Sequence, residues 1–152
     1  MAQIQVLSQE TPREELCSIP KSLIDANTRT TVIRGADGIW LYMPTSNSYD
    51  TDLSFYLGED LDGAIATLSD LKDLISNNSV GTQFTLKRSE SADCTVVVAD
   101  ALLNTQTKGT IRYVPDKLVF GADGYAGVAD ISASNIKKMI SRLSALKKRE
   151  EK

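Results

Sequence analysis

The sequence predicts an α+β fold in which antiparallel β-sheets are each covered on one face by an amphipathic helix. β-branched and alternating segments come before each of two helical patterns, in the order strands, helix, strands, helix. The chain has 152 residues, 41% of them apolar and 24% charged, as is ordinary for a globular protein. We therefore expect a single domain, 1–152, with an acidic half, 1–80, and a basic half, 81–152.

The segment 10–27 is the least regular part of the first half, and we treat it as an irregular leader. Within it, Thr11 and Glu14 have the spacing of a capping box, and Pro12 suits the first helical position. This pattern predicts a short helix that ends before Pro20.

The rest of the first half predicts strands followed by a helix. Gly35–Gly38 has the composition of a turn between two strands, because Gly and Asp tolerate positive φ. A helix is expected from Asp60, where apolar residues recur at steps of three and four. The expected strands are 3–7, 30–33, 39–43 and 53–57. The expected apolar stripe of the helix is Leu61, Ala64, Ile65, Leu68, Leu71, Leu74 and Ile75.

The second half has the same order of elements. Its Gly121–Gly124 repeats the tetrapeptide of Gly35–Gly38, and Ser132 or Ser134 caps the last helix. If the halves are a duplicated unit of four strands and a helix, about a dozen residues must be inserted in the first copy, and 44–52 would supply them. Duplication and independent halves both remain open. The expected strands are 83–87, 94–103, 110–114, 117–120 and 125–131, and the expected helix stripe is Ile136, Met139, Ile140, Leu143 and Leu146.

The residue types that are missing narrow the chemistry. The chain has no histidine, the commonest general base and metal ligand. Cys17 and Cys94 are far apart in sequence, which favours two reduced, buried thiols over a zinc site or a disulfide. No glycine-rich phosphate loop occurs, and Asp50 and Asp52 suit a turn better than a cation site. We therefore expect no enzyme activity, no catalytic residue, no metal and no cofactor.

The N-terminal sequence bears on localisation. Met1–Gln5 lacks the basic start and apolar stretch of a signal peptide. No apolar run approaches the ~18 residues that a membrane span needs. These features predict a cytoplasmic protein without a membrane partner.

Charge is divided unevenly along the chain. Residues 1–86 contain 5 Lys/Arg and 12 Asp/Glu, whereas 87–152 contain 12 Lys/Arg and 8 Asp/Glu, so net charges of −7 and +4 combine to −3. Such polarity directs a basic surface toward phosphates or an acidic partner, or one copy's acidic half toward another's basic half. The alternative is a solvated surface on which the charges happen to segregate.

Basic and aromatic residues on the expected strands suggest binding of single-stranded nucleic acid. Lys and Arg neutralise phosphates, and aromatic faces such as those of Trp40 and Tyr42 stack on unpaired bases. The alternative is that these aromatic residues are simply core. The candidate nucleic-acid-binding residues are Lys87, Arg88, Lys108, Arg112, Tyr113 and Lys117.

The order of four strands and a helix, found twice and clearest over 83–148, resembles the PC4, whirly and PUR-repeat group of nucleic-acid-binding proteins. The resemblance implies that a sheet face bears single-stranded DNA or RNA and that the helices build a dimer or pseudo-dimer. A second hypothesis is a structural or assembly protein of a virion or another large complex. It is favoured by the irregular leader, the charge polarity and the absence of catalytic motifs.

The last helix is a candidate for self-association. Its apolar residues approximate a heptad seam, which either packs on its own sheet or pairs with the same helix of another copy. The candidate oligomer interface is Ile136, Met139, Ile140 and Leu143.

Overall fold

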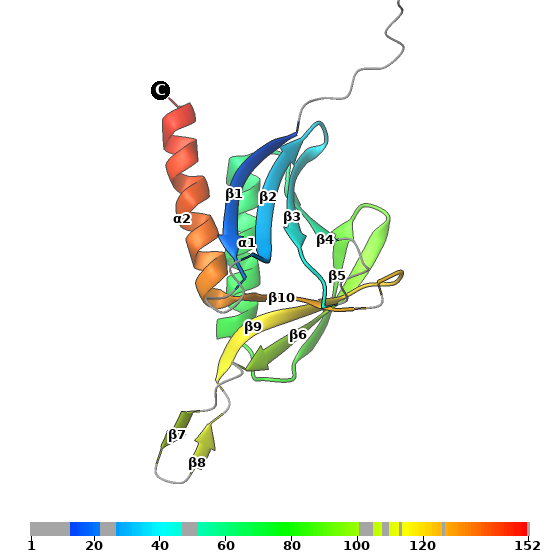
Figure 1. Ribbon diagram of the computed structural model, residues 1–152, viewed down its shortest axis with the longest axis vertical. Coiled ribbons are helices and arrows are strands. Elements are labelled where there is room, and N and C mark those ends of the chain that lie inside the picture. The colour runs from blue at the N-terminus through cyan, green and yellow to red at the C-terminus, as the bar shows by residue number, and fades with distance from the viewer. Residues whose placement is uncertain are drawn as a thin grey trace, which may run out of the picture.

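The chain contains two four-stranded antiparallel sheets, one two-stranded hairpin and two long helices in the residues described, seen here in a computed structural model (Figure 1). The structure describes residues 13–21, 27–46, 52–100, 114–125 and 127–151, together with the backbone alone of 105–107 and 110–112.

The elements follow one another in the predicted order. The first sheet contains β1 (Glu14–Pro20), β2 (Arg29–Gly35), β3 (Gly38–Met43) and β4 (Leu53–Gly58), and α1 (Leu61–Ser76) follows it. The second sheet contains β5 (Gln83–Ser89), β6 (Ala92–Asp100), β9 (Pro115–Gly121) and β10 (Ala129–Ser132), and α2 (Ala133–Glu150) follows it. A hairpin of β7 (Thr105–Thr107) and β8 (Thr110–Arg112) lies between β6 and β9. The α+β fold class is confirmed.

Both helices begin at the residues that the sequence indicates. The Asp60 side chain accepts a hydrogen bond from the Gly63 amide at 2.8 Å, and Ser132 accepts one from the Asn135 amide at 3.1 Å. Each cap satisfies a backbone donor that has no partner within the helix. Ser132, rather than Ser134, is therefore the cap of α2.

The core lies between the inner faces of the two sheets and the apolar sides of both helices. Alternate residues of each strand are buried, and the apolar stripes of α1 and α2 pack against them. Phe55 of the first sheet and Phe120 of the second meet edge to face, with ring centroids 5.6 Å apart. The two halves therefore share one hydrophobic core.

The leader contains a strand, so the helix predicted after Thr11 is wrong. β1 pairs antiparallel with β2, with Cys17 opposite Val32 and Ile19 opposite Thr30. This pairing buries the alternating side chains of Cys17 and Ile19, which a local capping signal does not outweigh. The expected strand 3–7 lies outside the described residues.

The two sheets have the same meander topology. The spatial orders are β1-β2-β3-β4 and β10-β9-β6-β5, with β7–β8 as the extra element in the second half. The two Gly-Ala-Asp-Gly segments are not equivalent, because Gly35–Gly38 joins the second and third strands of its sheet while Gly121–Gly124 follows the third. The insertion therefore lies in the second half, between β6 and β9, and not at 44–52.

Candidate functional site

Of the predicted nucleic-acid-binding residues whose side chains the structure describes, Lys87 and Lys117 lie on the outer face of the second sheet, and Arg88 does not. Lys87 is exposed on the outer side of β5, opposite Asp93 of β6, and Arg88 lies on the other side of the same strand. The Lys117 ammonium is 3.2 Å from the Asp130 carboxylate. Lys108 and Tyr113 lie outside the described residues, and for Arg112 only the backbone is described.

The predicted seam of α2 is occupied within the chain itself. The side chains of Ile136, Met139 and Leu143 have 0% exposure in the shared core, and Ile140 is partly buried against it. A partner helix cannot reach the three buried side chains without unpacking this core. Of the two alternatives for this helix, the structure shows the one in which its apolar side packs within its own chain.

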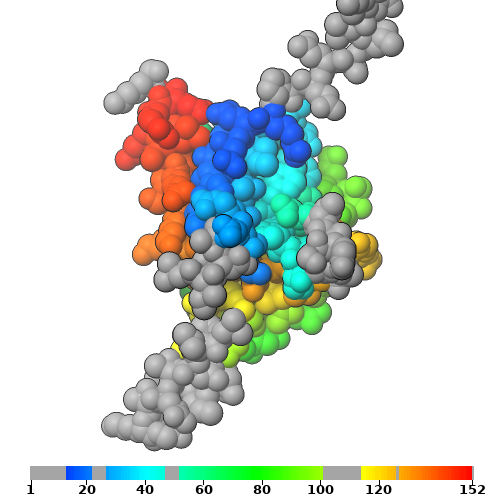
Figure 2. Space-filling model, viewed as in Figure 1, coloured from blue at the N-terminus to red at the C-terminus, as the bar shows by residue number. Residues whose placement is uncertain are grey.

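The outer face of the first sheet carries a group of partly exposed aromatic side chains. Ile39, Leu41 and Met43 point into the core, so Trp40 and Tyr42 point outward from the same strand. Tyr56 of β4 lies opposite Trp40, and their rings meet edge to face at 5.0 Å. Figure 1 shows α1 behind this sheet, and Figure 2 shows β2, β3 and β4 reaching the surface of the molecule on the other side.

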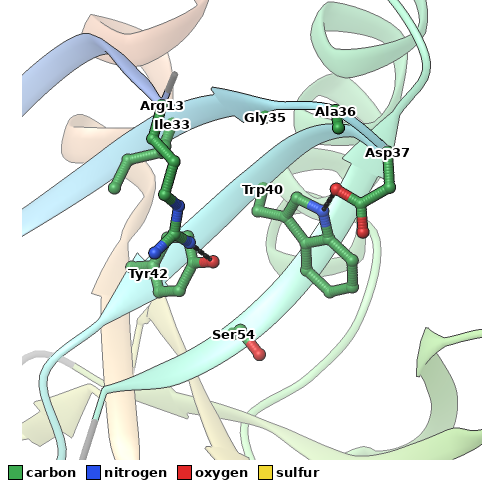
Figure 3. A pocket seen from close by; sticks show the side chains of 8 residues that line it. All are labelled: Arg13, Ile33, Gly35, Ala36, Asp37, Trp40, Tyr42 and Ser54. Atoms are coloured by element: carbon green, nitrogen blue, oxygen red, sulfur yellow. Dashed lines mark hydrogen bonds between the residues drawn. The ribbon is translucent and has the colours of Figure 1, made fainter. Parts of the chain in front are cut away.

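An arginine contacts one of these aromatic rings. The guanidinium carbon of Arg13 lies 5.2 Å from the ring centroid of Tyr42, and Arg13 Nη2 donates a hydrogen bond to the Tyr42 hydroxyl (Figure 3). Arg13 is exposed, and a guanidinium has further N–H donors besides the one that bonds Tyr42.

Tyr42 belongs to a row of four paired residues, one from each strand, that crosses the first sheet. Two further arginines lie at the two ends of this row. Arg29 Nε donates to Ser18 Oγ at 2.7 Å on the β1 side. Arg88 Nη1 donates to Ser54 Oγ at 3.3 Å on the β4 side. The guanidinium carbon of Arg88 lies 5.5 Å from the centroid of the Tyr125 ring. We name this row the arginine row. It consists of Arg13, Arg29 and Arg88 with Ser18, Thr31, Tyr42 and Ser54.

A small hollow lies between the arginine row and the tryptophan. Its volume is about 230 Å³, and Arg13, Trp40, Tyr42 and Ser54 are among the residues that line it (Figure 3). Trp40 Nε1 donates to Asp37 Oδ1 at 3.0 Å, which fixes the indole ring across the floor of the hollow. The hollow thus offers flat apolar rings beside a cation.

The opposite end of the same face is acidic. A second hollow of about 560 Å³ is lined by aromatic rings and carboxylates that belong to β3, β4 and the turns beside them. Burial and the charges of Glu59, Asp37 and Glu90 raise the pKa of the Tyr56 hydroxyl above its usual value. We name this site the acidic hollow, formed by Asp37, Trp40, Tyr56, Glu59 and Glu90.

Sequence reasoning found part of this face and missed the rest. It noted Trp40 and Tyr42 as strand aromatics, and the buried residues that alternate with them are the signal that both point outward. Tyr56 alternates in the same way on β4, so the same signal applies to it. Arg29 alternates with the buried Thr30 and Val32 of β2 and carries the same signal. Arg13 carries none, because it precedes β1, where the sequence indicates a helix.

Comparisons with protein-family models, with curated proteins and with solved structures found no match to this chain. Within the described residues, no helix is long and apolar enough to cross a membrane. In that same part of the chain, no three acidic, cysteine or histidine residues are grouped as a metal site requires.

Proposed function

We propose that the protein is a non-enzymatic, single-stranded nucleic-acid-binding protein that uses the outer face of its first sheet. The observation that carries the proposal is the arginine row, in which Arg13 contacts Tyr42 beside the partly exposed ring of Trp40. Aromatic rings stack on unpaired bases, and arginines neutralise phosphates. The resemblance in element order supports the choice of a sheet face.

The dimensions of the row suit a short single strand. Neighbouring strands of a sheet are ~4.8 Å apart, so a row across four strands is ~15 Å long. A strand of nucleic acid that crosses the sheet along this row has Arg29 at one end, Arg13 near the middle and Arg88 at the other end.

Electrostatics limits where the strand can lie. The carboxylates of the acidic hollow repel phosphates, and charges interact over the screening length of ~8 Å at physiological salt. The nucleic-acid strand therefore lies along the Tyr42 side of the face, and Trp40 lies at the edge of the interface. These charges therefore favour an interface on the first sheet over one on the basic second half.

The single tryptophan of the chain makes the proposal testable. Titration with single-stranded oligonucleotides should quench Trp40 fluorescence, and the affinity should fall with salt. Tyr42→Leu should weaken binding by roughly 5- to 150-fold, since one base stack contributes ~1–3 kcal/mol. Arg13→Gln should lower the slope of log K against log salt by about 0.7, the value for one phosphate contact on a single strand.

The matched control is Lys87→Gln, which removes an exposed cation from the outer side of the other sheet. This variant should bind like the wild type. Binding that is indifferent to salt, or that is weakened equally by Lys87→Gln and Arg13→Gln, would show that the arginine row is not the interface.

A further inference from the structure

No described cationic side chain lines the acidic hollow. Within the described residues, Glu59 and Glu90 have no hydrogen bond or ion pair with a cationic side chain, and Asp37 holds the indole of Trp40. Aromatic rings with carboxylates at their rim are the surroundings that attract an ammonium or guanidinium group. The chemistry of the hollow therefore matches a lysine or arginine side chain.

Helix α2 presents a matching surface on its exposed side. Its exposed residues recur with helical spacing and include five cations. No exposed carboxylate occurs on the helix before its final turn, and the small residues Ser141 and Ala145 lie between the cations. None of the five forms an ion pair in the described part of the chain, whereas Lys147 on another side pairs with Asp62. We name this surface the basic stripe, formed by Lys137, Lys138, Arg142, Lys148 and Arg149.

The two surfaces cannot meet within one molecule. Helix α2 lies beside β1, where Arg142 Nη1 donates to the Ser18 carbonyl at 2.9 Å. The acidic hollow lies at the opposite edge of the same sheet, beside β4 and the turn between β5 and β6. Figure 1 shows α2 and β5 on opposite sides of the first sheet.

We propose that the protein associates with itself head to tail, with the basic stripe of one copy docked on the acidic hollow of the next. Lysine side chains of the stripe enter the hollow against Trp40 and Tyr56 and meet the carboxylates of Glu59 and Glu90. Such a contact joins two different surfaces, so it repeats from copy to copy and builds a ring or an open chain. Self-association thus uses the polar side of α2, not its buried apolar seam.

A second copy fits the two surfaces better than a nucleic acid does. A basic helix face also attracts phosphates, but a nucleic acid on the stripe leaves the acidic hollow unexplained. Charge complementarity accounts for both surfaces with one contact. Association through opposite charges should also weaken with salt.

The experiment uses variants that remove charge from one surface at a time. Glu59→Gln with Glu90→Gln neutralises the hollow, and Lys137→Gln with Lys138→Gln neutralises the stripe. Sedimentation velocity over a range of concentrations and salt measures the association of each full-length chain. The wild type should form larger species at low salt, and each double variant should raise the dissociation constant at least ~10-fold. Circular dichroism checks that each variant is folded.

Mixing the two double variants provides the decisive measurement. One retains an intact stripe and the other an intact hollow, so the mixture should give a 1:1 dimer that grows no further. Controls at Glu15→Gln and Lys87→Gln, which remove exposed charges elsewhere, should associate like the wild type.

Three results would overturn the proposal. The first is a wild type that stays monomeric at low salt and high concentration. The second is association that the double variants leave unchanged. The third is a stripe variant that loses oligonucleotide binding and keeps its self-association, which would assign the stripe to nucleic acid. Loss of Trp40 quenching by oligonucleotides in Tyr42→Leu bears on the proposed function alone, because Tyr42 does not line the acidic hollow.

Discussion

The turn between β2 and β3 supports the aromatic face, and Gly38→Ala should disrupt both. Gly38 has a φ of +124°, a backbone conformation that residues with a side chain rarely adopt. A Cβ atom at this position would lie 2.6 Å from the Gly58 carbonyl oxygen and 2.8 Å from Cε1 of the Tyr56 ring. The backbone of β4 and an aromatic side chain would therefore both have to move.

The expected destabilisation has two sources. Positive φ at a non-glycine residue costs ~1–3 kcal/mol, and overpacking of a filled space costs typically ~1–3 kcal/mol. We expect a loss of about 3 kcal/mol or more, which corresponds to a Tm lower by about 6–12 °C for a chain of this size. Displacement of Tyr56 should also shift the fluorescence of Trp40, because the two rings are in contact.

The matched control is Gly81→Ala. Gly81 also has a positive φ, +95°, but a Cβ atom there meets nothing within 4 Å. This variant should lose only the same backbone term of ~1–3 kcal/mol, without the overpacking term, and leave Trp40 emission unchanged. Thermal unfolding followed by circular dichroism measures both variants. A Gly38→Ala protein that is as stable as Gly81→Ala would refute the proposed clash with Tyr56 and the β4 backbone.

Three further predictions concern an ion pair, the thiols and a helix cap. A hydrogen bond from Arg34 lowers the pKa of Glu150, so this contact stabilises the fold above the ordinary glutamate pKa and is lost as pH falls below it. The Tm difference between wild type and Arg34→Gln should therefore be largest near neutral pH and shrink below pH ~4, and a constant difference would contradict it. Burial raises the pKa of Cys17 and of Cys94 to about 11, so at pH ~8 only ~0.1% of either thiol is ionised. Both should react with a thiol reagent slowly in the native protein and rapidly in denaturant, whereas a fast native reaction would place them at the surface. Asp60→Ala removes the cap of α1 and should lower Tm by ~2–4 °C in a thermal scan, from a loss of ~1 kcal/mol; an unchanged Tm would mean that the cap is dispensable.

Most of the strands and both helices could be predicted from the sequence because their signals are local. The stripe from Leu61 to Ile75 and the alternation from Ile39 to Met43 each match the period of one element. The same alternation also separates the buried residues of β3 from Trp40, which lies on the candidate binding face. These parts of the fold depend on the local pattern of apolar residues along the chain. They do not depend on which distant segments pair.

The errors occurred where distant contacts decide the structure. The segment after Thr11 has a helix-capping pattern, but pairing with β2 makes it an edge strand. The repeated tetrapeptide suggested equivalent turns, but strand order places Gly35–Gly38 and Gly121–Gly124 at different points of their sheets. Local composition indicates that a turn forms and carries no information about which strands it joins.

The sequence by itself determined that this protein is built from two strand-rich halves, each ending in an amphipathic helix, because hydrophobic periodicity is a property of neighbouring residues. Only the tertiary structure decided that Arg13, Arg29 and Arg88 line one row across the first sheet, since strand pairing brings them together from distant parts of the chain. It also decided that the acidic hollow and the basic stripe lie at opposite edges of the molecule. Which surface of a folded protein carries which charge depends on how its helices and strands pack. The net charge of each half of the sequence does not determine that packing.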